Sequence, residues 1–165
     1  MYDPTLKAPV CNDVGIECTS GTLLNGSGPS EPNQPNTIAN SCSDGSGHTA
    51  VVDSIRIRTA DSTPLAPGKP VLIEASIRLT VPVARIRLYL AADALNPFWS
   101  GAGDFDVEAR LSGTRITLAG TDYWPAGGGR LRAMRVSFSG TNQFGSGPCA
   151  VGSGDDNDDL VFRVQ

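Results

Sequence analysis

The feature that most constrains the fold is an alternation of apolar and polar residues, with a period of two, that begins near residue 50. Apolar side chains occupy every second position from Val71 to Leu79, and arginines alternate with isoleucine and leucine within 83–91. This pattern is typical of strands with one buried face. The alanine- and leucine-rich segment 84–94 is the nearest helical alternative, but its alternating arginines favour a strand. The sequence therefore predicts an all-β protein.

About seven strands, separated by turns rich in glycine and proline, are typical of a β-sandwich of jelly-roll type. We expect the strands around Ile55, Val71, Val83 and Leu131 to form the core, with Val136 facing inward and the alternating arginines facing solvent. The segments that carry the pattern are 51–57, 71–79, 83–91, 107–111, 114–118, 131–138 and 160–164.

Residues 1–49 show almost no periodicity. Glycines and a proline series at Pro29, Pro32 and Pro35 interrupt any regular element there. No repeat or domain boundary is visible, and the length suits one domain. We therefore expect a single domain over 1–165, in which an irregular N-terminal arm (1–49) packs on a β-sandwich (50–165).

Four cysteines in a lysine-poor chain favour disulfides and an extracellular, secreted protein. Of the three possible pairings we favour Cys11–Cys18, which closes a short loop, together with Cys42–Cys149, which closes a long one. A zinc site is the alternative, but the usual close cysteine spacing is missing. Met1 is not followed by a signal peptide. The chain is then either part of a longer secreted precursor or a cytosolic protein with free thiols.

Composition excludes several function classes. The net charge of −4 argues against nucleic-acid binding, and one histidine argues against most catalytic triads and against sites with several histidine ligands. No apolar run approaches the ~20 residues that span a bilayer, so we expect no membrane insertion.

The sharpest local signal is an acidic run before the last predicted strand. In an extended segment Asp155, Asn157 and Asp159 point one way and Asp156 and Asp158 the other. Clustered carboxylate oxygens suit Ca²⁺. The run is not an EF-hand, because Leu160 stands where the loop glycine belongs, so further ligands are needed. We name Asp44, Asp53 or backbone carbonyls for that part; a solvated acidic turn is the alternative.

Catalytic motifs are not evident. The chain has no G-x-S-x-G sequence, His48 lies in a glycine-rich loop, and no pair of glutamates is marked out. We therefore predict that the protein is not an enzyme. Tyr123 and Trp124 lie between a glycine and a proline, so they form a candidate ligand-binding loop, although most tryptophans in small sandwiches are core or loop anchors.

Six stretches of the sequence belong together as a pattern: Gly21–Gly26, Glu31–Ile38, Ser41–Gly45, Leu88–Asp93, Asn96–Trp99 and Asp156–Phe162. They resemble a C-terminal accessory domain found on large secreted bacterial hydrolases, especially peptidases of myxobacteria and similar organisms. The resemblance implies a non-catalytic β-sandwich with two disulfides and a structural calcium near Asp44 and 155–159. It does not extend to 100–129, and the loop around His48 is shorter.

These observations lead to one expectation and one alternative. We expect a secreted, calcium-binding accessory domain that tethers an attached extracellular hydrolase to a polymeric protein or carbohydrate substrate or to a cell surface. The alternative is a structural subunit of an extracellular assembly or appendage, which self-association would favour. A small hydrolase is a third interpretation, but it needs an acid/base pair that the sequence does not show.

Overall fold

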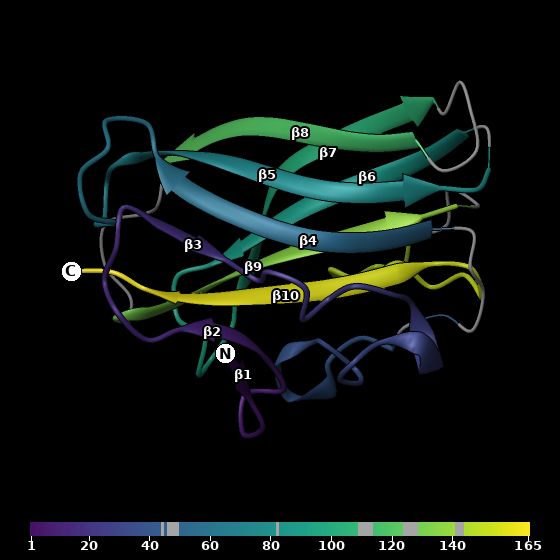
Figure 1. Ribbon diagram of the computed structural model, residues 1–165, viewed down its shortest axis with the longest axis horizontal. Helices are drawn as coiled ribbons and strands as arrows, with labels where there is room; N and C mark the ends of the chain where they lie inside the picture. Colours follow the sequence, from purple (N-terminus) through teal and green to yellow (C-terminus); the bar gives the residue numbers. More distant parts are fainter. Residues whose placement is uncertain (44, 46–49, 82, 109–113, 124–128, 141–143) are drawn as a thin grey trace.

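The computed structural model describes residues 1–165 except 44, 46–49, 82, 109–113, 124–128 and 141–143. The described residues form ten strands in two sheets, with two short 3-10 turns at Gly28–Ser30 and Ile38–Asn40 and no α-helix (Figure 1). The predicted all-β class and two-sheet architecture are therefore confirmed.

The larger sheet has six strands and the smaller has four. In spatial order the larger sheet contains β1 (Tyr2–Asp3), β2 (Ala8–Cys11), β10 (Asp156–Arg163), β9 (Leu131–Ser139), β6 (Val83–Ala91) and β7 (Trp99–Glu108). The smaller sheet contains β3 (Glu17–Thr19), β4 (Ala50–Thr59), β5 (Pro70–Leu79) and β8 (Thr114–Tyr123).

Neighbouring strands pair antiparallel, with one exception. Strand β2 pairs parallel to β10, with Val10 opposite Val161 and Cys11 opposite Phe162. The two strands come from opposite ends of the sequence, and they lie side by side in Figure 1. Strand β10 is consequently held on one side by β2 and on the other by β9.

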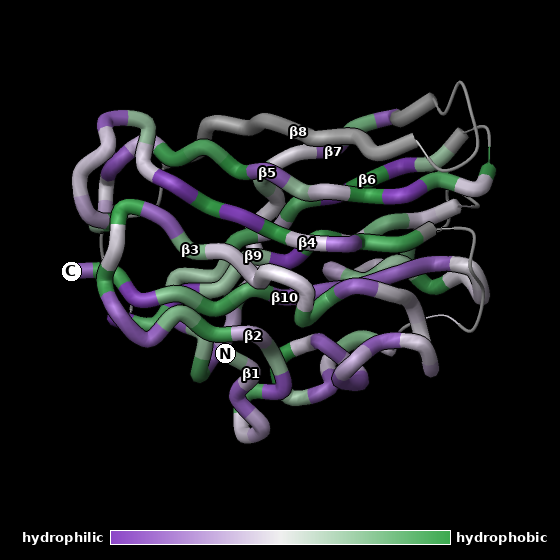
Figure 2. The backbone as a smooth tube through the Cα atoms, in the orientation of Figure 1, coloured by the Kyte–Doolittle hydropathy of each residue, from purple (hydrophilic) through white to green (hydrophobic). Residues whose placement is uncertain are grey.

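The main core lies between the two sheets and follows the predicted alternation. In β5 the residues at alternate positions from Val71 to Leu79 are buried, and Figure 2 shows apolar and polar residues alternating along this strand. On β9, Met134, Val136 and Phe138 are fully buried in the same core. The predicted inward orientation of Val136 is thus confirmed.

A second, smaller core covers the opposite, outer face of the six-stranded sheet. Val10, Ile38, Ala133 and Val161 are among its members, and Ile38 comes from the second 3-10 turn. The N-terminal arm runs alongside β10 in Figure 1, and its Ile38 belongs to this outer core. Residues 148–150 cover the same face, where Pro148 and Ala150 form hydrogen bonds with Ser137 and Asn157, and the two strands are buried on both faces along most of their length.

The structure differs from the sequence expectations in several places. Strand β10 begins at Asp156 rather than at 160, so the acidic run lies within the last strand, and β8 extends to Tyr123, which was expected in a loop. Strand β7 begins at Trp99, well before the expected 107. The sequence pattern did not indicate its first part, because the glycines and aspartates there have low β-propensity. The arm, expected to be irregular, contains β1, β2 and β3, which join both sheets. Strands of two to four residues are too short to display a period of two.

Both predicted disulfides are confirmed. Cys11–Cys18 links β2 of the larger sheet to β3 of the smaller sheet. Cys42–Cys149 joins the end of the arm to the segment that precedes β10. The second bond therefore brings distant parts of the sequence to the acidic run.

Candidate metal centre

The acidic run divides between the two faces of β10, as the alternation predicts. Leu160 and Phe162 belong to the core between the sheets and Val161 belongs to the outer core. Asp156 and Asp158 therefore face the space between the sheets, while Asp155, Asn157 and Asp159 face the arm. All five are at most 1% exposed, so the run is not a solvated turn.

On the outer face, Asp159 forms a buried ion pair with Arg135. The Nε and Nη2 atoms of Arg135 each donate to a carboxylate oxygen at 2.7 Å, and the backbone N–H of Ile38 donates to the same carboxylate at 2.7 Å. The guanidinium also stacks 4.3 Å from the ring centroid of Trp99 and donates to the hydroxyl of Ser41. Asp159 is thus fully engaged by protein donors.

The other two outer residues hold the adjoining loops. Asp155 accepts hydrogen bonds from the hydroxyl of Ser139 at 3.0 Å and the backbone N–H of Gly140 at 3.2 Å. Asn157 accepts from the N–H of Ala150 at 2.9 Å and donates to the carbonyls of Ser43 and Ala150. These side chains form hydrogen bonds with backbone groups of the loops around the Cys42–Cys149 disulfide, in place of the backbone partners that a strand would provide.

On the inner face, Asp156 and Asp158 meet a third carboxylate, that of Glu31. One oxygen from each of the three lies within 4.8 Å of the other two. Asp156 also accepts a hydrogen bond of 2.6 Å from the N–H of Val52 on β4, across the sandwich. Asp156 and Asp158 are completely buried, and the Oε1 atom of Glu31 is inaccessible to solvent although the residue is only partly buried.

The local backbone brings Glu31 to this place. It follows the first 3-10 turn, and its N–H donates to the carbonyl of Gly28 at 3.1 Å. The turn closes tightly against Gly26, which has φ +146°, and a Cβ there would stand 3.1 Å from Cα and from Cγ of Glu31. Only glycine readily combines this φ with so close an approach.

A fully buried amide, that of Asn36, contacts one of the three carboxylates, that of Glu31. The Nδ2 of Asn36 donates to Oε2 of Glu31, and the Asn36 backbone carbonyl accepts from the N–H of Asp159 at 2.8 Å. Within the described part of the chain, Oδ1 of Asn36 accepts no hydrogen bond. A buried amide oxygen of this kind is a suitable additional ligand for a hard cation.

Three carboxylates this close together form a group that could hold a metal ion. Burying a charge is costly unless an opposite charge compensates it, and three carboxylates within 4.8 Å add mutual repulsion. A divalent ion would neutralise the repulsion, and a set of oxygen ligands matches Ca²⁺ more closely than it matches zinc or copper. We refer to Glu31, Asp156 and Asp158 as the acidic trio.

Not every residue named from the sequence joins the trio. Asp53 is nearly buried but is engaged by Arg78, whose Nε lies 2.8 and 2.9 Å from its two carboxylate oxygens. Asp44 and Trp124 lie outside the described residues, and Tyr123 is described only as the last backbone position of β8. The two members from the acidic run, Asp156 and Asp158, were named from the sequence.

Sequence reasoning missed Glu31 as a member of the acidic trio. It stands between proline-rich stretches and far from the acidic run, so spacing gives no signal that they meet. The contact depends on how the arm packs against β10.

Comparison with known proteins adds no identification. No protein family matches this sequence, and no curated protein is similar enough to it to indicate a relative. Among the described residues there is no helix long and apolar enough to cross a membrane. Functional inference therefore depends on the geometry.

Proposed function

We propose that the acidic trio holds a structural Ca²⁺ ion and that the chain is a non-catalytic, calcium-stabilised accessory domain. The observation that carries the proposal is the convergence of three buried carboxylates from the arm and β10 within 4.8 Å. Asn36 supplies a fourth oxygen through Oδ1. The ion would join the arm to the last strand, because Glu31 comes from the one and Asp156 and Asp158 from the other.

A structural role for the ion follows from its place. The trio is enclosed, and Ca²⁺ bound there would have few positions open to a substrate. Binding to the folded state alone raises stability with the logarithm of free calcium. At about a hundredfold excess over the dissociation constant the gain is about 2.7 kcal/mol, or roughly 5–10 °C in Tm for a chain of this size.

The test is a thermal melt with excess calcium and with chelator. We expect the parent to lose several degrees in chelator and Asp158→Asn to respond to neither reagent. Asp106→Asn is the matched control, because Asp106 is 77% exposed and distant in the fold from the trio. If the parent melts identically in calcium and in chelator, there is no calcium site.

The accessory role is proposed from the resemblance to C-terminal domains of secreted bacterial hydrolases, including peptidases. Two disulfides are compatible with an oxidising, extracellular compartment, which supports secretion. The jelly-roll assignment is part of this proposal; it is supported by connections β5–β6, β7–β8 and β8–β9, which all pass between the sheets.

The proposed absence of catalysis is supported by the state of the surface carboxylates. Glu17 and Glu74 both form ion pairs with Arg56, and Glu74 also pairs with Arg58. Carboxylates neutralised in this way are poorly placed to serve as an acid/base pair. Turnover of peptide or glycoside substrates that survives repurification and disappears in a Glu108 or His48 variant would contradict the proposal.

A further inference from the structure

A hollow of ≈ 400 Å³ lies on the six-stranded sheet where β6 pairs with its edge strand, β7. It is lined by Arg87, Leu88, Tyr89, Gly101, Gly103 and Asp104. A β-bulge creates it, because Tyr89 is opposite Gly101 whereas Leu88 is opposite Gly103, which leaves Ala102 as the extra residue. Since position 101 has no side chain, the space beside Tyr89 stays open.

The polar groups of the hollow form a compact, fixed unit. Asp104 accepts hydrogen bonds from Arg85 Nε at 2.5 Å, from Arg85 Nη2 at 2.7 Å and from Arg87 Nε at 3.2 Å. These contacts, mainly the one with Arg85, lower the pKa of Asp104 below its ordinary value, so the carboxylate stays ionised. The Arg87 guanidinium also stacks 4.2 Å from the ring centroid of Phe144.

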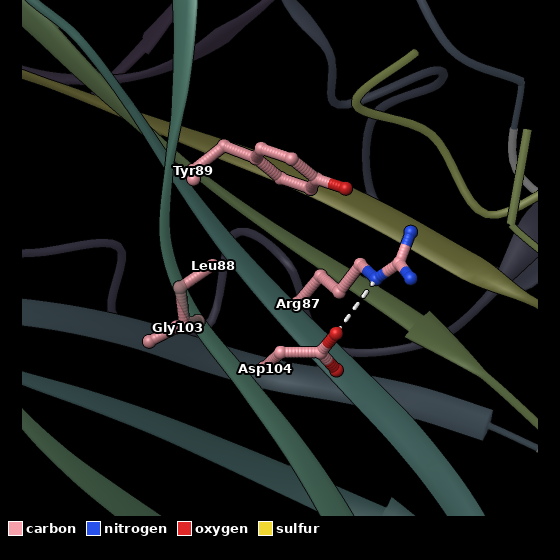
Figure 3. Close-up of a pocket in the computed structure, with 6 residues that line it drawn as sticks. Arg87, Leu88, Tyr89, Gly103 and Asp104 are labelled. Carbon is pink, nitrogen blue, oxygen red and sulfur yellow. Dashed lines mark hydrogen bonds and ion pairs between the residues drawn. The ribbon is translucent and has the colours of Figure 1, made fainter. Parts of the chain in front are cut away.

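Several hydrogen-bonding groups of the hollow remain available. Among the residues that the structure describes, neither the hydroxyl of Tyr89 nor the terminal nitrogens of Arg87 have a hydrogen-bond partner. In Figure 3 the side chains of Tyr89, Arg87 and Asp104 lie on the same side of the two strands. A flat aromatic ring, a planar donor group and an acceptor are thus presented together.

We propose that this hollow binds one sugar ring of a neutral polysaccharide, which deepens the proposed accessory function by naming the class of its partner. An aromatic ring provides an apolar surface for the C–H face of a pyranose, and the planar groups of Arg87 and Asp104 suit paired hydroxyls at the ring's edge.

Charge balance distinguishes a neutral ligand from an ionic one. Two arginines and two aspartates lie together here, since Arg85 also approaches Asp106 at 3.8 Å. The unit therefore has no net charge to attract an anion or a cation. Because β7 is the edge strand, a polymer can cross the hollow and continue beyond the sheet on that side.

The decisive variant fills the hollow without disturbing the strand. A Cβ at Gly101 meets no atom within 4 Å, so Gly101→Val should fold and block the space beside Tyr89. Gly147→Val is the matched control, because a Cβ there also meets nothing within 4 Å and Gly147 does not line the hollow. Tyr89→Ala removes the ring, and Phe98→Ala removes an exposed aromatic outside the hollow.

The experiment titrates the parent chain and these four variants with cello-, xylo-, manno- and chito-hexaose and follows binding by calorimetry. We expect saturable binding of at least one oligosaccharide that weakens roughly tenfold or more in Gly101→Val and Tyr89→Ala and is unchanged in both controls. Polygalacturonate serves as the anionic comparison and a proline-rich peptide as the comparison of another class.

Each other outcome overturns the proposal. These outcomes are no binding of any neutral oligosaccharide at millimolar concentration, binding unaffected by Gly101→Val, or preferential binding of the anionic polymer or the peptide. Melting the same samples with calcium and chelator reports on the trio separately. A lost calcium response with intact sugar binding, or the reverse, therefore identifies which proposal has failed.

Discussion

The acidic side chains on the two faces of β10 have different surroundings. On the outer face, Asp155, Asn157 and Asp159 are each met by donors of the protein, and Asp159 by the guanidinium of Arg135. On the inner face, Asp156 accepts a hydrogen bond from the N–H of Val52, but Asp156 and Asp158 also meet a further carboxylate, that of Glu31.

The difference shows that burial alone does not indicate what an acidic residue does. Where the surroundings supply N–H and guanidinium groups, the carboxylate replaces missing backbone partners and fixes loops. Where carboxylates gather, as in the acidic trio, the proposed calcium ion would offset their mutual repulsion. Outer-face substitutions should therefore act regardless of calcium, and inner-face substitutions should act through it.

The largest effect is expected from breaking the outer ion pair. Asp159→Ala leaves Arg135 charged and buried, which should lower the free energy of unfolding by about 3–5 kcal/mol in calcium and in chelator alike. Urea unfolding measures this. The double variant Asp159→Leu with Arg135→Met should be less destabilised, since neither charge then remains; an equal loss would mean that the pair is not the cause.

A smaller, conditional effect is expected on the inner face. Glu31→Gln removes one charge of the trio, so it should cost about 2 kcal/mol of the stability gained from excess calcium. In chelator it should cost none, because it also relieves the repulsion among the carboxylates. Calcium-dependent melts and a calcium titration by calorimetry measure it. If the variant loses the same free energy of unfolding in chelator, Glu31 acts independently of calcium, as the outer-face residues do, and the two faces do not differ.

The smallest effect is expected at an exposed carboxylate. The pKa of Asp61 is lowered from 3.8 to about 2, chiefly by the hydrogen bond from the Thr63 hydroxyl. Its contribution to stability is therefore complete above pH 3.8 and is lost as the pH falls towards 2. Because Asp61 is exposed, Asp61→Asn should barely change the melt at neutral pH. Carboxyl NMR titration gives the pKa, and a midpoint near 3.8 would contradict it.

The sequence predicted what depends on short-range pattern. Alternation located β5 and the inward face of Val136, and the same rule separated Asp156 and Asp158 from their neighbours on β10. It could not reveal the first part of β7, where the bulge at Ala102 lies between Gly101 and Gly103, because glycine carries no hydropathy signal for either face.

The rest depends on contacts between distant segments. Glu31 approaches β10 only because the arm packs along that strand, and Asp53 is engaged by a cross-strand arginine, Arg78. Neither partner is indicated by local spacing. Both disulfides were predicted because few pairings are possible among four cysteines.

The parallel pairing of β2 with β10 has a consequence for the order of folding. Residues 8–11 find one hydrogen-bonding partner nearby, in β1, and the other in β10, at the opposite end of the sequence. Joining such distant segments costs conformational entropy before their contacts add stability, and this slows folding. We therefore expect the pairing of β2 with β10 to form late, and an intermediate without it would expose the arm's apolar residues to other chains.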